Sequence, residues 1–255
     1  MEISALASGS SGNCFYIGNG KAAILIDAGI SAKQILLRLE KINIDPQKIR
    51  ALFITHEHID HVRGSDVIAR KLNIPIYATK ETAKNCFLCS DRKLINHIDQ
   101  NSITDIYGLK VEAFSKSHHA ADPVSFNVIE KKKVSVITDA GHACVNIKNH
   151  VSDCDFLCLE ANHDENMLEN GHYPRFLKNL IKSDLGHLSN LQAALCTLEF
   201  ASPKLKTIIL SHLSRTNNTP QLALKTFNSI IRERKNFNPF IEISQREEPT
   251  TLFKI

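Results

Sequence analysis

Short apolar runs separated by glycine, proline or polar turns recur along the chain and predict a large content of β-strand. These runs occupy residues 3–6, 14–17, 22–26, 51–54, 102–104, 109–114, 123–130, 134–138, 156–160 and 205–210. Other segments carry apolar residues three or four positions apart, the spacing of one helix face. They are residues 31–41, 66–72, 173–182, 191–200 and 222–232. Strands and helices are therefore both expected over most of the chain.

Residues 74–77, Ile-Pro-Ile-Tyr, predict a short strand at the edge of a sheet. Proline has no N–H to donate to a neighbouring strand, and an edge position tolerates this loss. No segment has the composition of a linker, a low-complexity tract or an obvious internal repeat. We therefore expect residues 1–255 to form a single domain.

The overall composition is that of an ordinary globular protein. Of the 255 residues, 43% are hydrophobic and 23% are charged. No apolar run approaches the ~18 residues of a membrane span, and the N-terminus lacks the pattern of a secretory signal. Seven cysteines, an odd and scattered set, argue against a disulfide framework. These features predict a soluble, cytoplasmic protein with no membrane partner and leave its oligomeric state open.

The strongest chemical signal is the segment Thr55-His56-Glu57-His58-Ile59-Asp60-His61, which follows the apolar run 51–54. Side chains alternate along a strand, so a strand ending at Thr55 would deliver His56 and His58 to one face. Asp60 and His61 would follow in a turn or in the first turn of a helix. This pattern predicts two adjacent metal sites. Imidazole and carboxylate ligands without thiolate suit zinc, manganese or iron.

Six of the strand-like segments end in a histidine or an acid. These strand-end residues are Asp27, His56, His118, Asp139, Glu160 and His212. One such ending is routine, but six predict a shared site along one edge of packed sheets. We expect Asp27 to orient a ligand histidine, a common role for a carboxylate at a metal site. The alternative is an ordinary turn aspartate before Gly29.

In their order along the chain, these residues resemble the five motifs of the metallo-β-lactamase fold. The matching positions are Asp27, the segment from His56 to His61, His118, Asp139 and His212. The resemblance implies an α/β (α+β) protein folded as a four-layer αββα sandwich. It also implies two divalent metal ions, zinc or manganese. The implied ligands are His56, His58 and His118 for one metal, Asp60, His61 and His212 for the other, and Asp139 as a bridge.

The C-terminal motifs resemble those of the RNase Z type phosphodiesterases. They are Leu159-Glu160-Ala161, Gly186-His187-Leu188-Ser189 and the segment from Ile209 to Arg215. In those enzymes a glutamate and a histidine outside the metal shell cooperate at the leaving group. The resemblance therefore implies that a metal-bridging hydroxide attacks phosphorus while His187, polarised by Glu160, protonates the departing oxygen. With the ligand Asp60, these two residues form the implied catalytic set.

A more specific resemblance is to the bacterial YycJ (WalJ) family. It rests on Ser8-Gly9-Ser10-Ser11-Gly12-Asn13, on Glu160-Ala161-Asn162-His163-Asp164 and on Gly186-His187-Leu188-Ser189-Asn190. That family is described as metal-dependent and exonuclease-like, acting 5′ to 3′ on DNA. The resemblance implies a nucleic acid substrate, DNA. Asn162 and His163 follow Glu160 toward the expected site, and the guanidinium of Arg215, shortly after His212, can bind a phosphate bidentately. These three residues are therefore candidate substrate contacts.

The chain departs from the family at the third motif, which usually reads Ser-His-Asp-Ala. Here it reads Ser117-His118-His119-Ala120. Alignment assigns His118 as the metal ligand and His119 as its neighbour or a substrate contact.

Two other functions remain open at this stage. The same metal centre would activate water against carbonyls, so a hydrolase of small thioesters, lactones or lactams is the first alternative. The pair Glu160 and His187 favours phosphodiester chemistry over it. A non-catalytic protein that retains the fold is the second alternative, and the complete set of ligands speaks against it.

Overall fold

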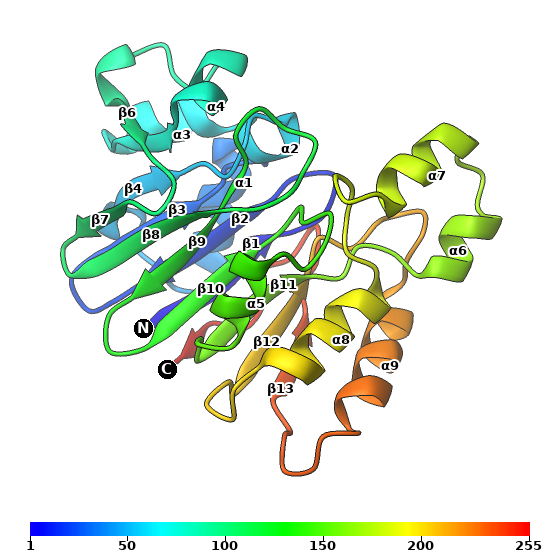
Figure 1. Ribbon diagram of the computed structural model, residues 1–255. Coiled ribbons are helices and arrows are strands. Elements are labelled where there is room, and N and C mark those ends of the chain that lie inside the picture. The colour runs from blue at the N-terminus through cyan, green and yellow to red at the C-terminus, as the bar shows by residue number, and fades with distance from the viewer. The chain divides into compact units, whose positions relative to one another are not determined.

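The computed structural model describes residues 1–255, which divide into two units (Figure 1). Unit 1 comprises Met1–Ser115, Ala120–Lys132 and Gln245–Ile255, and unit 2 comprises Lys116–His119 and Lys133–Ser244. Neither unit is one continuous stretch of chain. That residues 1–255 act as a single domain stays a prediction.

Unit 1 is built on a seven-stranded mixed sheet. Its strands, in spatial order, are β14 (Phe253–Lys254), β1 (Glu2–Ala7), β2 (Cys14–Gly18), β3 (Ala23–Ile26), β4 (Ile49–Phe53), β5 (Ile76–Thr79) and β6 (Ile95–Ile98). The pairs from β14 to β3 are antiparallel, and those from β3 to β6 are parallel. Every residue of β2 and β3 is buried, as expected for strands covered on both faces.

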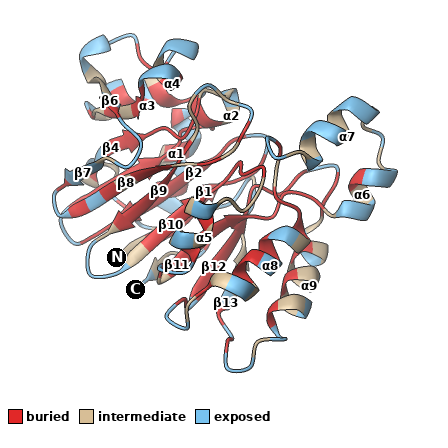
Figure 2. Ribbon diagram, viewed as in Figure 1, coloured by how far each residue is buried: buried red, intermediate tan, exposed pale blue.

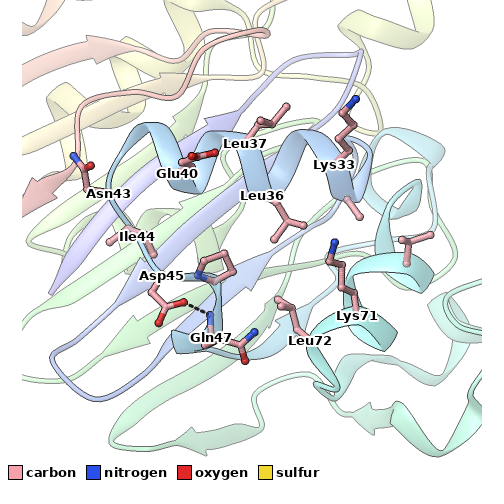
Figure 3. A pocket seen from close by; sticks show the side chains of 13 residues that line it. Lys33, Leu36, Leu37, Glu40, Asn43, Ile44, Asp45, Gln47, Lys71 and Leu72 are labelled. Atoms are coloured by element: carbon pink, nitrogen blue, oxygen red, sulfur yellow. Dashed lines mark hydrogen bonds between the residues drawn. The ribbon is translucent and has the colours of Figure 1, made fainter.

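Helices of unit 1 cover this sheet and form a core with it (Figure 2). Ser31 caps α1 (Ala32–Lys41) by accepting a hydrogen bond from the Gln34 N–H, and the buried side chains of α1 follow the helical period. The remaining helical segments are α2 (Ile59–Val62), α3 (Ser65–Leu72), α4 (Lys80–Asn85) and the 3₁₀ turns at Pro46–Lys48 and Arg92–Leu94. A cavity of about 870 Å³ lies between α1 and α3 and contains no candidate metal ligand (Figure 3).

A second set of strands in unit 1 is antiparallel. It consists of β7 (Ile103–Ile106), β8 (Leu109–Ser115) and β9 (Val124–Ile129). The ring of Phe126 on β9 packs edge-on against Phe53 at the end of β4, with ring centroids 5.4 Å apart. This contact anchors the strand from which the histidine motif emerges.

Unit 2 contains four parallel strands covered by helices. The strands, in spatial order, are β10 (Lys133–Ile137), β11 (Phe156–Glu160), β12 (Thr207–Ser211) and β13 (Phe240–Ile243). The helices α5 (Val145–Val151), α8 (Asn190–Phe200) and α9 (Pro220–Ile231) pack on them, whereas α6 (Glu165–Asn170) and α7 (Arg175–Lys182) follow β11 (Figure 1). The carboxyl ends of parallel strands meet at one edge, so residues after β10, β11 and β12 are brought together.

Most predicted elements are confirmed within a few residues, but the edge position of residues 74–77 is wrong. Strand β5 lies between β4 and β6. Pro75 precedes the strand and contributes only its carbonyl oxygen, which accepts the Leu52 N–H at 2.9 Å. No N–H is needed from Pro75, so a central strand tolerates it. The segments β6, α4, α5 and α6 were not predicted.

No helix of the chain combines the length and apolar character needed to cross a bilayer. The seven cysteines are all free thiols.

Candidate metal centre

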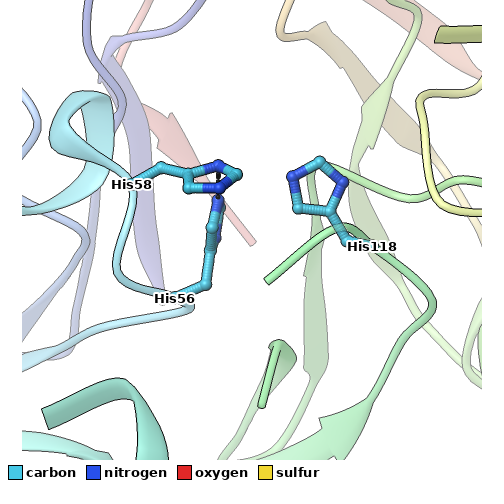
Figure 4. Close-up of side chains that lie close together, drawn as sticks. All are labelled: His56, His58 and His118. Carbon is cyan, nitrogen blue, oxygen red and sulfur yellow. Dashed lines mark hydrogen bonds between the residues drawn. The ribbon is translucent and has the colours of Figure 1, made fainter. Parts of the chain in front are cut away.

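The histidine motif of unit 1 lies in the loop from β4 into α2. His58 is the N-cap of α2, so Asp60 and His61 fall in the first turn of a helix, as one of the two alternatives predicted. The Nε2 atom of His56 lies 3.0 Å from Nδ1 of His58 (Figure 4), and the rings of His56 and His61 have centroids 4.1 Å apart. His56 and His61 are fully buried. The motif therefore gathers three imidazoles and one carboxylate into one cluster.

Asp27, directly after β3, contacts this cluster. Its Oδ2 lies 2.7 Å from Nδ1 of His61, and its Oδ1 accepts the Thr55 N–H at 2.8 Å. Because Nδ1 of His61 faces the carboxylate, Nε2 is the nitrogen left to bind a metal. This contact places Asp27 as predicted, while its metal-orienting role stays a prediction. The supporting hydroxyl of Thr55, which also reaches Asp27, was not singled out from the sequence.

Asn13, the last residue of the glycine- and serine-rich turn, also reaches the cluster. Its Nδ2 lies 3.1 Å from Nε2 of His61 and 3.4 Å from Oδ2 of Asp60. Its Oδ1 accepts the Gly9 N–H at 2.9 Å, which fixes the amide against the turn. Sequence reasoning noted this turn but did not assign Asn13 to the site.

Gly29 is the point of closest approach between the turn after β3 and the histidine motif. A Cβ at residue 29 would lie 1.5 Å from the Asp60 carbonyl oxygen and 2.6 Å from the Asn13 nitrogen. Both neighbours are backbone atoms and hydrogen-bonded to each other at 2.8 Å, so neither yields easily.

Gly29→Ala is therefore expected to destabilise the fold by at least about 3 kcal/mol, the upper range for overpacking, and to weaken metal binding. Thermal unfolding and metal titration measure the two effects. Gly20→Ala is the matched control, because a Cβ there meets nothing within 4 Å. Equal unfolding temperatures for the two variants would contradict this account of Gly29.

Unit 2 gathers a second group of possible ligands at the carboxyl ends of its strands. Asp139, Glu160, His187 and His212 have ligand atoms that all lie within 4.8 Å of one another. Asp139 Oδ1 lies 3.4 Å from Nε2 of His212 and 3.9 Å from Nε2 of His118. These separations are close to the ~3.4 Å between two ligand atoms of one tetrahedral zinc.

Glu160, at the end of β11, is saturated by protein donors. Its Oε1 lies 2.8 Å from Nδ1 of both His187 and His212, and its Oε2 accepts the N–H groups of Ala140 and Leu188. Burial by itself would raise the pKa of this carboxyl, but the charges and hydrogen bonds of the two histidines lower it overall. The carboxylate of Glu160 therefore contacts both rings through their Nδ1 atoms. Its contact with His212 was not foreseen.

His187 is the most exposed ring of the unit 2 group. Its side chain is 20% exposed, against 2% for His212 and 4% for His118. It lies just before α8, whose capping box joins Ser189 to Gln192. With Nδ1 held by Glu160, Nε2 is the ring nitrogen available for proton exchange.

His118 and His119 differ sharply in their surroundings. His118 is buried and its Nδ1 lies 3.1 Å from the Gly186 carbonyl oxygen, whereas His119 is exposed. Burial lowers the pKa of His118 to about 3, although Asp139 opposes the shift. A neutral imidazole is the form that binds metals. These contacts support His118 over His119 as the ligand.

The three candidate substrate contacts lie in two different settings. Asn162 and His163 are buried, and the Asn162 amide donates to the His212 carbonyl oxygen at 3.0 Å. Burial also lowers the pKa of His163 to about 4, so its ring is neutral. Arg215 is exposed. Substrate contact by these residues stays a prediction.

Three site residues share an unusual backbone conformation. Asp27, Asp139 and His212 follow strands and have φ angles of 61°, 53° and 57°. Aspartate and histidine tolerate this left-handed region better than most residues. The chain therefore turns sharply at each of these strand ends.

The donors in both units fit a hard or borderline divalent metal. They are imidazole nitrogens and carboxylate oxygens, and the second ring nitrogens of His61, His118 and His212 face protein acceptors. Such outer contacts are typical of metal-binding histidines. The chemistry of these residues therefore supports the use of divalent metal.

Comparison with known proteins places the chain in a family. The model of the metallo-beta-lactamase superfamily matches residues 7–151. Exodeoxyribonuclease WalJ of Streptococcus pneumoniae is 38% identical over 232 residues, which cover 89% of this chain and 86% of that protein. Exodeoxyribonuclease YycJ of Bacillus anthracis is 34% identical over 241 residues, with 92% and 90% coverage. The chain therefore belongs to the metallo-β-lactamase superfamily and, within it, to the family of WalJ and YycJ.

The solved structures agree on the fold. The metallo-beta-lactamase fold protein YhfI from Bacillus subtilis superposes with a TM-score of 0.71 at 12% identity and covers 98% of both chains. The predicted fold class, the αββα sandwich of this superfamily, is thus confirmed.

Proposed function

We propose that this protein is a metal-dependent exodeoxyribonuclease that removes nucleotides in the 5′ to 3′ direction. Two relatives aligned over most of the chain are named exodeoxyribonucleases, which supports this proposal. The structural observation that supports it most is Glu160, which joins the ligand candidate His212 to the partly exposed His187. A single carboxylate thus holds one ring for metal binding and the other for proton transfer.

The proposed ligands follow the order of the family motifs. His56, His58 and His118 are assigned to one metal, Asp60, His61 and His212 to the other, and Asp139 to both. Zinc or manganese held by these residues would lower the pKa of bound water and would neutralise charge on the phosphate oxygens.

The remaining roles, orienting the proposed ligands and supplying a proton, are proposed for residues of the protein itself. Asp27 and Thr55 fix the tautomer and angle of His61, and Glu160 and the Gly186 carbonyl do the same for His212 and His118. Glu160 holds Nδ1 of His187, so that Nε2 presents a proton to the oxygen that leaves phosphorus. Asn162 supports His212 from its backbone side.

Three residues are proposed to contact the substrate. Arg215 is proposed to contact a phosphate, as a guanidinium does bidentately. Asn162 and His163 follow Glu160 in the sequence and are proposed to contact the substrate. Residues 1–255 are proposed to act as one domain in the cytoplasm, the compartment that an odd, scattered set of cysteines favours.

Degradation of matched substrates tests the proposal. We expect loss of nucleotides from 5′-phosphorylated DNA in manganese or zinc, much slower loss from RNA of the same sequence, and none in Asp60→Ala. A chromogenic lactam tests the small-molecule alternative in the same buffers. Turnover of the lactam with intact DNA would overturn the nuclease proposal in favour of that alternative.

A further inference from the structure

Helix α7 of unit 2 is unusual in having no buried residue. Figure 2 shows it exposed or partly exposed along its whole length. Phe176 is 74% exposed and Leu180 is 39% exposed, although both are large apolar side chains. Its exposed residues are Arg175, Phe176, Asn179, Leu180 and Lys182. At one hundred degrees per residue, these five positions share one side of the helix.

This exposed side of α7 carries two cations, Arg175 and Lys182. Lys182 pairs with Glu169 at 2.6 Å, and the Lys178 ammonium donates to the Glu169 carbonyl oxygen at 2.6 Å. These bonds tie α7 to α6. Arg175 forms no side-chain hydrogen bond or ion pair within the chain. Arg175 therefore places one cation next to Phe176 on the exposed side of the helix.

The end of α7 is bonded directly to the residue assigned to the leaving group. The His187 N–H donates to the Ile181 carbonyl oxygen at 3.0 Å. Gly186 allows this approach, because a Cβ there would lie 2.1 Å from the same oxygen. This backbone bond ties the C-terminal end of α7 to the residue that carries the proposed catalytic ring.

We infer that Arg175 and Phe176 on α7 bind a single DNA strand next to the scissile bond. This inference rests on the proposed nuclease function and extends it to a substrate-holding surface. An exposed aromatic ring beside cations is the combination that proteins use to stack a base and neutralise its phosphate. A membrane surface suits α7 less, because eight residues with two large exposed apolar side chains offer little area for insertion.

Binding of a fluorescent 5′-phosphorylated single-stranded oligonucleotide, measured in EDTA to prevent hydrolysis, tests the surface. Phe176→Ala and Arg175→Ala are each expected to raise Kd about tenfold, in line with the loss of one stacked base or one phosphate contact. The logarithm of Kd should depend less steeply on salt in Arg175→Ala, but not in Phe176→Ala. The KM for DNA in metal should rise with Kd, with kcat changed less.

Matched controls are Phe87→Ala and Arg92→Ala, which remove an exposed phenylalanine and an exposed arginine from unit 1. Wild-type Kd and KM in both α7 variants, with DNA still degraded, would overturn the surface and leave the nuclease proposal standing. A raised Kd in Phe176→Ala and Arg175→Ala, with no DNA hydrolysis by the wild-type protein, would support DNA binding by α7 and refute the nuclease proposal. Anionic phosphatidylglycerol vesicles provide the membrane arm. Vesicle binding lost in Phe176→Ala, with unchanged DNA binding, would also overturn the inference.

Discussion

His58→Ala is expected to lose metal and hydrolytic activity together. His58 is the N-cap residue of α2 and lies 3.0 Å from His56 within the histidine cluster, so its removal deletes a proposed ligand. Loss of a residue that merely supports a ligand costs ~10- to 100-fold in metal affinity, and loss of the ligand itself should cost more. Activity on DNA should fall by at least the same factor at limiting metal.

Metal content after dialysis and the rate of DNA hydrolysis measure this prediction. His97→Ala is the control, since His97 is an exposed histidine of the same unit on β6. A His58→Ala protein that keeps both metal and rate would remove His58 from the ligand set. Loss of activity with full metal content would instead assign it to substrate binding.

His187→Ala is expected to keep its metal and lose turnover. General acid catalysis contributes ~10²- to 10⁴-fold, so kcat on DNA should fall by that factor. The loss should be much smaller on bis(p-nitrophenyl) phosphate, because p-nitrophenolate leaves without needing a proton. A purely structural role for His187 would reduce both rates equally.

Glu160→Gln tests separately whether Glu160 supports His212 and whether it supports His187. Its carboxylate contacts His212 as well as His187, so this variant should lower metal affinity in addition to kcat. Unchanged metal affinity in Glu160→Gln would limit its role to His187. A His187→Ala protein that hydrolyses DNA at the wild-type rate would end the general acid assignment.

Much of the fold was predictable because the apolar pattern is strong where strands are buried. The strands β2, β3 and β11 are wholly buried and were recognised from short apolar runs. Strand β6 was missed because only one of its four residues is buried, which leaves no alternation to detect. Pro75 led to the wrong position for β5. A proline disrupts the hydrogen bonding of a central strand only where its N–H would be needed, and Pro75 precedes β5 and contributes only its carbonyl oxygen.

The candidate site was predictable as a set of residue types but not as a set of contacts. The spacing from His56 to His61 indicated ligands, and strand-end acids indicated their supports. The side-chain contacts of Asn13 with His61 and of Glu160 with His212 depend on how loops return to the sheet edge. These contacts join residues that are distant in the sequence, and the spacing of apolar residues along the chain does not predict them. The exposed face of α7 likewise became visible only once packing showed what the helix leaves uncovered.

The most direct test of metal-dependent 5′ to 3′ hydrolysis uses DNA labelled at either end. With manganese or zinc, the account predicts that 5′ label is released as a mononucleotide at the earliest times, while 3′ label stays in strands that shorten progressively. EDTA should stop both changes. Early release of 3′ label, internal cuts with both ends retained, or an equal rate in EDTA would contradict it.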